Sequence, residues 1–419
     1  MKKRLLIYAH YYAPDVASTG QILQDLAEGM TDEFDVTVIC TVPSYTGKIA
    51  EGYKEKRFYR EEINSVHVLR VPVPEFTKSR KKSRVKNLLA YYFEACKATD
   101  LVGLQDYVFT ISQPPIMGGM LGVYGKWKLN AKLIYCIQDF NPEQIMATGY
   151  IKSKFLFKVA MWLDKRSCRS SDLVVTVGRD LCETLDQRFQ GEKVPNYTMI
   201  NNWIDEKQFR PLPMNDVNVA AFRNRFGLDG KFVIMYSGNI GLYYDFEGLF
   251  RVIGSIRNLK TPDGRDVVLA VVGAGAMLGK LKDHQQTNKM ENVVFIPYQE
   301  KKRLVYSLNA ADVHWCVNAM GIKGISCPSK FYGIAAVGKP VLGVLENGTE
   351  ICMLIKETGC GKCAKPRDYQ GIAEMVEWFV IHAGDEELSI MGSRGREYLM
   401  NHLTKDNSVS KYIEAINNT

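Results

Sequence analysis

The amino-acid sequence predicts an α/β protein with two successive Rossmann-like domains, each a doubly wound parallel sheet. Short apolar strands alternate with helical segments in two series, which a polar stretch containing Pro211 and Pro213 separates. The chain has 419 residues, of which 46% are apolar and 24% are charged, and it is too long for one ordinary core. Ligands of such domains bind at the carboxyl ends of the strands, so a cleft between the two domains is the expected site.

The first series opens with a βαβ unit. A strand is expected over residues 4–9, an amphipathic helix over 20–30 and a second strand over 35–41. Further strands are expected over 107–112, 132–137 and 173–177. We expect this first domain to span residues 1–205, followed by a linker with a short helix over 206–230.

The second series repeats the pattern over residues 231–389. Its strands are expected over 232–237, 267–272, 292–296, 312–317 and 340–345. Its helices are expected near 244–259, 275–287, 300–310, 328–337, 348–357 and 368–383. The regular alternation predicts a second parallel sheet with helices on both faces.

Glycine-rich turns follow two strands of the second domain. Ser237-Gly238-Asn239-Ile240-Gly241 comes directly after one strand, and Gly273-Ala274-Gly275 repeats the arrangement one unit later. Small residues let backbone N–H groups approach an anion closely, although either motif alone is also ordinary turn geometry. Neither motif is a Walker A loop, and no GxGxxG follows the first strand, so NTP hydrolysis and NAD binding are not favoured.

A lysine opens one of the predicted helices, in the segment Pro328-Ser329-Lys330. Backbone N–H groups at a helix N-terminus already attract anions, so a cation there opposes the helix macrodipole unless a negative group lies opposite it. A phosphate group would resolve this conflict. Together with the two glycine turns, this lysine predicts a phosphate-binding site in the second domain.

The composition narrows the class of protein. No run of about 18 apolar residues appears, and the start of the chain turns polar too soon for a signal peptide, so we expect a cytoplasmic protein without a membrane span. The ten cysteines show no disulfide-framework spacing. Cys360-Gly361-Lys362-Cys363 lacks a second pair for zinc, and an ordinary loop is expected there. None of the six histidines stands in a recognisable triad order, so acyl transfer has no support.

The order of these motifs resembles that of the retaining GT-B glycosyltransferases of family 4. The matching segments are YYAPDVASTGQILQDLAEGM, TVPSYTGK, ISQPP, QDFNPE and SSDLVVTVG, then NVVFIPYQ, NAADV and CPSKFYGIAAVGKPVLG. The resemblance covers nearly the whole chain and is nearest to the subgroup with a Pro-Ser-Lys motif that builds bacterial O-antigen or capsule repeat units. It implies a GT-B fold whose two domains face a cleft around a nucleoside-diphosphate sugar. It also implies a C-terminal helix, here residues 390–419, that crosses back to the first domain.

The resemblance implies roles for individual residues. Lys330 matches the phosphate-binding lysine, which would neutralise the leaving diphosphate with help from the helix N-terminus at Ser329, so that neither a metal nor another cofactor is required. Asp139 matches the loop that meets the sugar near the reacting carbon, but it fits a turn-capping role as well. The donor is expected to be a UDP-sugar. The other donor-binding residues implied are Ser18, Thr19, Gly20, Gly238, Asn239, Gly241, Gly273, Gly275, Pro297 and Tyr298.

Three positions depart from the family pattern. Asn239 stands where the family usually has a basic residue, which leaves more of the charge to Lys330. Ile325 and Gly333 stand where the family commonly has two glutamates, the second of which usually holds the ribose. Glu350 is a candidate substitute, although it fits equally well as the first-turn acid of a helix.

A basic run in the first half predicts contact with a membrane. Residues 78–97 carry a net charge of +6, against +8 for the whole chain. Its cations, opposed by Glu94 alone, are Lys78, Arg80, Lys81, Lys82, Arg84, Lys86 and Lys97. The aromatic face over 88–93 suits a membrane surface, and the alternative is a helix that packs in its domain beside a solvated basic loop. We expect the run to hold the protein at the inner face of the cytoplasmic membrane, near a lipid-linked acceptor. No nucleic-acid-binding fold accompanies it.

Three functions remain open from the sequence. The first is transfer of a hexosyl or N-acetylhexosaminyl group, with retention, from a nucleotide donor to a lipid-linked saccharide. The second is a sugar-nucleotide 2-epimerase of the same fold, for which Asp15, Asp139 and His10 form no convincing catalytic set. The third is a non-catalytic partner that binds a sugar nucleotide and lost transfer when Ile325 and Gly333 replaced the glutamates.

Overall fold

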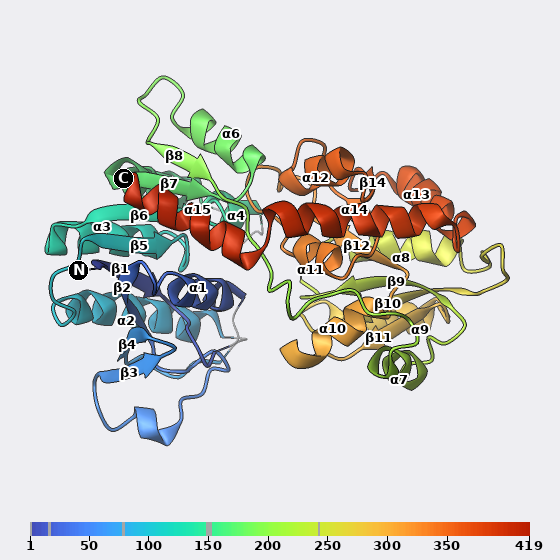
Figure 1. The fold of residues 1–419 in the computed structure, drawn as a ribbon, viewed down its shortest axis with the longest axis horizontal. Helices are drawn as coiled ribbons and strands as arrows, with labels where there is room; N and C mark the ends of the chain where they lie inside the picture. The colour runs from blue at the N-terminus through green and yellow to red at the C-terminus, as the bar shows by residue number, and fades with distance from the viewer. Residues whose placement is uncertain (1, 16–17, 78–79, 148–152, 242–243) are drawn as a thin grey trace. The chain divides into compact units, whose positions relative to one another are not determined.

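The computed structural model describes residues 2–15, 18–77, 80–147, 153–241 and 244–419, with the backbone alone at Ser18. The chain divides into two compact units (Figure 1). Unit 1 comprises Met1–Asn201, Gly324–Ser326 and Asp406–Thr419. Unit 2 comprises Asn202–Lys323 and Cys327–Lys405.

Unit 1 is built on an eight-stranded sheet in the order β3-β4-β2-β1-β5-β6-β7-β8. All neighbouring strands are parallel except β3 and β4. The central strands are buried apolar runs, as expected for a parallel sheet covered on both faces. The strands are β1 (Lys3–Ala9), β2 (Phe34–Thr41), β3 (Tyr59–Ile63), β4 (Val66–Val71), β5 (Tyr107–Ile111), β6 (Lys132–Ile137), β7 (Leu173–Thr176) and β8 (Tyr197–Met199).

The β3–β4 hairpin was not predicted from the sequence. Its two-residue turn, Asn64 and Ser65, has positive φ at both positions (49° and 65°), which matches the twist that a two-residue hairpin requires. β3 lies at the sheet edge and exposes alternate residues, so it lacks the apolar run by which the other strands were recognised.

The helices of unit 1 cover its sheet. α2 packs against α3, and α3 packs against α5, while Tyr412 of α15 lies against Phe109 of β5 with ring centroids 5.9 Å apart. The helices are α1 (Ser18–Gly29), α2 (Lys81–Thr99), α3 (Met117–Leu129), α4 (Glu143–Ala147), α5 (Lys154–Ser170), α6 (Arg179–Arg188) and α15 (Lys405–Asn417), with a short 3₁₀ turn over Glu51–Tyr53.

Unit 2 has a six-stranded, all-parallel sheet in the order β11-β10-β9-β12-β13-β14. Its core is formed by the buried faces of these strands and by α8 and α13. The strands are β9 (Phe232–Ser237), β10 (Val267–Val272), β11 (Val293–Ile296), β12 (Val313–Val317), β13 (Val341–Val344) and β14 (Gly361–Ala364). The helices are α7 (Val217–Arg225), α8 (Phe246–Ser255), α9 (Leu278–Thr287), α10 (Lys301–Asn309), α11 (Lys330–Ala336), α12 (Glu350–Thr358), α13 (Tyr369–Ile381) and α14 (Glu386–His402).

The predicted fold class is confirmed, because both units are parallel-sheet α/β domains. Boundaries differ in detail. The segment 206–230, predicted as a linker, lies within unit 2 and contains α7. Residues 390–419 form parts of two helices, α14 in unit 2 and α15, whose residues from Asp406 onward belong to unit 1. The loop predicted at Cys360–Cys363 is wrong in part, because β14 pairs with β13 there.

Candidate active site

The two glycine turns of unit 2 form one continuous surface at the carboxyl ends of β9 and β10. Gly238 has φ 149° and Gly273 has φ 141°, backbone conformations that other residues rarely adopt. A Cβ atom on Gly273 would lie 2.0 Å from the carbonyl oxygen of Gly238. The turns are joined by the N–H of Ile240, which donates to the carbonyl of Ala274 at 2.9 Å. Glycine is therefore needed for the two loops to approach each other.

Lys330 lies against this surface. A Cβ atom on Gly238 would lie 2.8 Å from Cε of Lys330, so the glycine also makes room for the lysine side chain. Nζ of Lys330 donates to the hydroxyl of Tyr244 at 3.1 Å. It also lies 5.3 Å from the ring centroid of Tyr236 and 4.7 Å from that of Tyr244, within the range of cation–π attraction.

The ammonium of Lys330 is half-buried but stays charged. Burial acts to lower its pKa, but the interactions with Tyr244 and Tyr236 outweigh burial, and the pKa lies above its usual value. Within the described ranges, no carboxylate forms an ion pair with Lys330. Its charge is therefore held by aromatic rings and one hydroxyl, and it remains available to an anionic ligand.

A small pocket of about 140 Å³ opens beside Lys330. It is lined by Ser237, Ser329, Lys330, Gly333, Trp315 and apolar side chains of α10 and α11. A Cβ atom on Gly333 would meet Leu308 and Ile204 at 3.5 and 3.7 Å, which are ordinary contact distances, so one added carbon fits there. The indole Nε1 of Trp315 is buried without a hydrogen-bond partner among the described residues. The pocket thus offers one cation, the ammonium of Lys330, whereas the indole of Trp315 packs in the core of the unit 2 sheet.

The proposed part of Ser329 in binding the diphosphate stays a prediction. Ser329 is the residue before α11, but its φ and ψ of −68° and −10° are helical, and its side chain makes no capping hydrogen bond. α11 has only seven residues. The charge of Lys330, rather than a strong helix N-terminus, is therefore the main attraction for an anion in this pocket.

The remaining predicted donor residues lie around the same strand ends or close to α11. Asn239 and Gly241 belong to the first turn, where the hydroxyl of Tyr236 donates to the carbonyl of Asn239 at 2.6 Å. Gly275 belongs to the second turn, and a Cβ atom on it would lie 2.1 Å from the carbonyl oxygen of Ile240.

Pro297 and Tyr298 follow β11, and the Tyr298 ring is 63% exposed. Glu350 opens α12 and is only 2% exposed. Its charge adds to burial in raising the pKa of Tyr332. Among the residues that the structure describes, Glu350 does not line the pocket beside Lys330, so its proposed contact with the ribose stays a prediction.

Unit 1 brings together three residues from separate segments, namely the first turn of α1 and the loops after β5 and β6. The hydroxyl of Thr19 donates to Oε1 of Gln113 at 3.1 Å, and Nε2 of Gln113 lies 3.5 Å from Oδ2 of Asp139. Gly20 is packed tightly here, since a Cβ atom on it would lie 2.9 Å from the carbonyl oxygen of Tyr11. Ser18 lies at the start of α1. Gln113 was not singled out in the sequence, although it belongs to the segment ISQPP that carried the resemblance.

Asp139 lies two residues after the end of β6 and is partly buried. Burial raises the pKa of its carboxyl group, and hydrogen bonds with Ser326, Gln144 and Gln113 offset part of that rise. The segment Gly324–Ser326 packs onto this loop, since the N–H of Phe140 donates to the carbonyl of Ile325 at 2.8 Å. Ile325, the first of the two positions that lack the family glutamate, therefore contributes backbone contacts beside Asp139.

Two other titratable residues of unit 1, His10 and Asp15, were weighed as catalytic candidates in the sequence. His10 is buried, and burial lowers its pKa to about 4. Asp15 accepts the N–H of Ser44 at 2.9 Å and that of Tyr45 at 3.2 Å, which fixes the following loop. Asp15 is therefore accounted for by the fold, whereas Nε2 of the buried His10 has no hydrogen-bond partner among the described residues.

The basic run lies on and before α2. Arg80 precedes the helix, and Lys81, Lys82, Arg84 and Lys86 are exposed in its first turns, whereas Lys78 lies outside the described residues. The helix buries Tyr91 and Ala95 against the sheet, which matches the packing alternative. Val85, Leu89 and Phe93 are nevertheless exposed on the opposite side.

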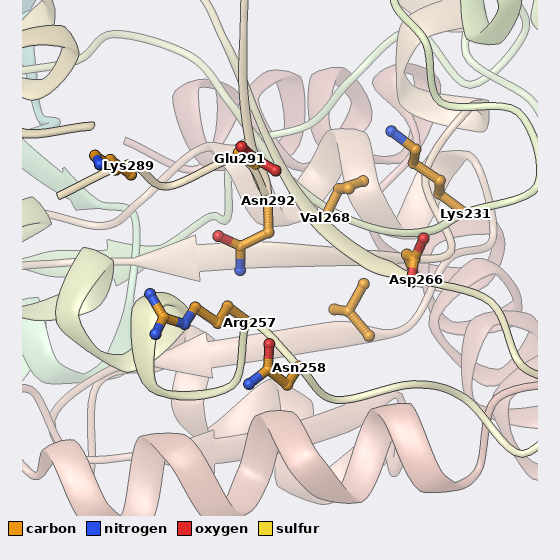
Figure 2. Close-up of a pocket in the computed structure, with 9 residues that line it drawn as sticks. Lys231, Arg257, Asn258, Asp266, Val268, Lys289, Glu291 and Asn292 are labelled. Atoms are coloured by element: carbon orange, nitrogen blue, oxygen red, sulfur yellow. The ribbon is translucent and has the colours of Figure 1, made fainter. Parts of the chain in front are cut away.

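A larger hollow of about 480 Å³ lies at the amino ends of the unit 2 strands (Figure 2). Lys231, Arg257 and Lys289 line it together with Asp266 and Glu291. Its charges are mixed, and it lies at the end of the sheet opposite the glycine turns. It therefore lacks the concentrated positive charge that a diphosphate requires.

Both units match known domain families. Residues 19–203 match the Glycosyl transferase 4-like domain, and residues 219–398 match the Glycosyl transferases group 1 family. This chain carries both glycosyltransferase domains. The glycine turns, Lys330 and its pocket all fall in the group 1 domain, whereas Thr19, Gln113 and Asp139 fall in the 4-like domain.

Two relatives align over most of their length with this glycosyltransferase chain. A probable glycosyltransferase, WbjE of Pseudomonas aeruginosa, is 26% identical over 350 residues, which cover 82% of this chain and 83% of WbjE. The putative colanic acid biosynthesis glycosyl transferase WcaI of Escherichia coli K12 is 24% identical and covers 99% of both chains.

Solved structures confirm the two-domain fold of the GT-B type. Sucrose-phosphate synthase from Thermosynechococcus elongatus superposes with a TM-score of 0.75 at 15% identity, covering 100% of this chain and 99% of that one. Anabaena Alr3699/HepE in complex with UDP superposes with a TM-score of 0.70 at 12% identity, covering 100% of both chains.

Proposed function

We propose that this glycosyltransferase moves a hexosyl or N-acetylhexosaminyl group from a nucleoside-diphosphate donor, with UDP favoured, to a lipid-linked saccharide. The bond between the anomeric carbon and the diphosphate oxygen breaks, and the acceptor hydroxyl oxygen bonds to that carbon on the face that the diphosphate leaves. The proton of the acceptor hydroxyl passes to the leaving diphosphate. The product belongs to a bacterial surface polysaccharide, of the O-antigen or capsule kind. The relatives WbjE and WcaI, one of them assigned to colanic acid biosynthesis, support this reaction class.

The observation that carries the proposal is the position of Lys330 beside the two glycine turns. A leaving diphosphate gains negative charge as the glycosidic bond breaks, and a fixed cation stabilises this charge more than that of the ground state. Two loops whose glycines allow close approach, together with an ammonium that no described carboxylate neutralises, form a suitable anion site. Because Lys330 supplies the charge, we propose that transfer proceeds without a divalent metal.

Asp139 is proposed to act on the transferred sugar from unit 1. Its carboxyl is held next to Gln113, which also accepts from Thr19, so three polar side chains from separate segments of the chain converge. A carboxylate at this place can accept a hydrogen bond from a sugar hydroxyl and stabilise positive charge near the anomeric carbon. The alternative is that Asp139 only orders its own turn.

The lipid-linked acceptor is supported by the charge of unit 1. Lys81, Lys82, Arg84 and Lys86 are exposed on α2. Each basic residue near an anionic lipid surface contributes roughly 1 kcal/mol of attraction. None of the described helices is long and apolar enough to cross a bilayer, and the proposed attachment is peripheral, at the cytoplasmic face.

A donor panel tests the proposal. The protein is incubated with UDP- and GDP-sugars, with and without EDTA, and release of the nucleotide is followed; with a lipid-linked or short soluble acceptor, NMR then gives the anomeric configuration of the product. We expect slow release of UDP from one UDP-sugar, unaffected by EDTA, and a product of retained configuration. Inversion or dependence on a metal would refute those parts of the proposal.

The two alternatives give different results in the same panel. A 2-epimerase would convert the donor sugar to its epimer without net release of UDP, and a non-catalytic partner would bind the nucleotide without turnover. The glycine at position 333 favours the non-catalytic partner. The pocket beside Gly333 lacks the carboxylate with which family 4 glycosyltransferases usually hold the ribose.

A further inference from the structure

Three helices of unit 1 form one layer on a single face of its sheet. α2 contacts β2 and β4, α3 contacts β5 and β6, and each helix also contacts its neighbour in the order α2, α3, α5. α3 and α5 approach closely, since a Cβ atom on Gly119 would lie 2.8 Å from Cβ of Ser167. The sides of these helices that point away from the sheet therefore face one common direction.

The outward side of α5 exposes large apolar side chains between its lysines and arginines, unlike an ordinary surface helix. Phe155, Val159 and Trp162 are spaced along one face of the helix and are 73%, 39% and 55% exposed. The opposite side buries Asp164 and Ser167. We call Phe155, Leu156, Val159 and Trp162 the α5 stripe. The helix exposes these four apolar side chains to solvent, and a contiguous exposed apolar patch indicates an interaction surface.

The neighbouring helices extend this surface. Trp127 lies on the side of α3 opposite its buried glycines and is 76% exposed. On α2, Val85, Leu89 and Phe93 recur every four residues and are 51%, 41% and 58% exposed. Apolar side chains from all three helices are thus exposed on the outer face of one layer.

The charge of the layer identifies the partner. α2, α3 and α5 together carry twelve lysines and arginines against two acids, a net charge of +10, whereas the whole chain carries +8. Outside these helices, Asp100, Asp172 and Glu192 pair with four of the cations, which still leaves a strong positive excess. Nearly all the excess positive charge of the protein is therefore concentrated beside its exposed aromatic residues.

We propose that the outer face of the α2–α3–α5 layer docks on an anionic lipid bilayer, with the α5 stripe inserted at the boundary between headgroups and acyl chains. Aromatic side chains with flanking lysines suit this boundary, because the rings enter the apolar region and the ammonium groups reach the phosphates. Lys158 and Arg166 flank the stripe, and Arg166 lies over the ring of Trp162 at 5.8 Å. A protein interface of this lysine content is disfavoured, because lysine is depleted at interface cores.

The inference rests on the proposed function in one respect, because an enzyme with a lipid-linked acceptor must work at a membrane surface. It adds an apolar anchor on α5, which the basic run of α2 does not provide. Electrostatic attraction alone disappears as salt screens it, with a reach of about 8 Å at physiological ionic strength, whereas an inserted aromatic side chain persists.

Flotation with lipid vesicles tests the anchor. Binding is compared on vesicles of phosphatidylcholine with phosphatidylglycerol and on vesicles of phosphatidylcholine alone, for the wild type and for the double variant Phe155→Ser/Trp162→Ser. A matched control, Val217→Ser/Ile381→Ser, removes two exposed apolar side chains from unit 2. We expect the wild type and the control to float with anionic vesicles, and the α5 variant to partition about tenfold or more weakly for each lost aromatic.

Tryptophan fluorescence gives a second readout. Trp127 and Trp162 are exposed, whereas Trp203 and Trp315 are buried and Trp378 is partly buried. A blue shift on vesicle addition is therefore expected to come from the first two. Trp162→Phe should reduce the shift while retaining flotation, since phenylalanine still inserts. The charge reversal Lys158→Glu/Arg166→Glu should weaken binding to anionic vesicles without disturbing the core, and Lys301→Glu/Lys302→Glu in unit 2 serves as its control.

The outcomes separate the possibilities. Flotation of the Phe155→Ser/Trp162→Ser variant at wild-type strength overturns the anchor. A wild-type dimer in light scattering that becomes monomeric in this variant assigns the stripe to a second copy of the chain and also overturns it. Vesicle binding is measured without sugar nucleotide, so it does not depend on sugar transfer. If the protein transfers no sugar but floats with vesicles through the α5 stripe, the proposed function is refuted and the membrane anchor is retained.

Discussion

Nζ of Lys330 lies 3.1 Å from the hydroxyl of Tyr244, a residue 86 positions earlier in the chain. The tyrosine accepts the hydrogen bond, and its ring lies under the ammonium. This arrangement fixes a cation without neutralising it, because a hydroxyl and a ring carry no charge at neutral pH. An anionic leaving group can therefore use the full charge of Lys330.

The first prediction concerns the hydroxyl of Tyr244. Tyr244→Phe keeps the ring but removes the acceptor, so the lysine loses its fixed direction, and we expect kcat to fall about tenfold, in line with one hydrogen bond to a charged group. Tyr244→Ala should cost more. Tyr197→Phe, which removes a tyrosine hydroxyl that bonds Asp186 in unit 1, should leave kcat unchanged. Steady-state kinetics at saturating donor provide the measurement, and unaltered turnover in both Tyr244 variants would contradict the role.

The second prediction concerns Gly333 in the interior of α11. Gly333→Ala places a methyl group at ordinary contact distances of 3.5 and 3.7 Å from Leu308 and Ile204. Relative to glycine, alanine should stabilise the helix by about 0.5–1 kcal/mol. If the pocket beside Lys330 receives part of the donor, the donor KM should rise while thermal stability improves. Improved stability with an unchanged KM would place the donor outside this pocket.

The third prediction separates two roles of Asp139. Asp139→Asn should retain UDP affinity, because the residues proposed to bind the nucleotide lie in unit 2, and should lower turnover on the order of a hundredfold if the carboxylate stabilises the sugar. Calorimetry with UDP and kinetics with the sugar nucleotide measure the two effects. A variant that unfolds, or that loses stability without losing turnover, would favour the turn-capping role.

The fourth prediction is a pH dependence of stability from buried histidines. His314 is 1% exposed, and burial lowers its pKa from 6.5 to about 4. Below pH 6.5 the unfolded chain binds the proton and the folded chain does not, so stability is fully present above pH 6.5 and is lost as pH falls towards 4. The loss from this one group is about 3 kcal/mol.

Urea unfolding at several pH values measures this slope. His314→Gln does not titrate, so its stability should fall less steeply between pH 6.5 and 4. Equal slopes in the wild type and in His314→Gln would contradict the assignment.

Features that depend on local spacing were predictable from the sequence. The glycine turns after β9 and β10 and the lysine that opens α11 are short motifs at strand and helix ends, and the structure places them together. The β3–β4 hairpin was missed because its edge strand is polar and its turn is Asn-Ser rather than Asn-Gly. β14 was missed because Cys360–Cys363 is short and rich in small residues.

Features that depend on contacts between distant segments were not predictable. Tyr244 meets Lys330, and Gln113 meets Thr19 across 94 residues, and no periodicity records either pairing. The apolar face of α5 is visible in the sequence, but such a face normally packs inward, and only the structure shows that Phe155 and Trp162 point outward. The exposure of the apolar side chains of α5 in the structure therefore distinguishes a helix that packs in the core from one that can dock on a partner.

The most direct test of the account is nucleotide release by the Lys330→Ala variant. Release of UDP from the UDP-sugar that the wild type uses is measured in EDTA, beside Lys302→Ala, which removes an exposed lysine of unit 2 outside the pocket. With the fold confirmed by circular dichroism, we predict a loss of a hundredfold to a thousandfold in Lys330→Ala, as for removal of other transition-state charge donors, and wild-type release in Lys302→Ala. Wild-type release by a folded Lys330→Ala protein would contradict the central claim.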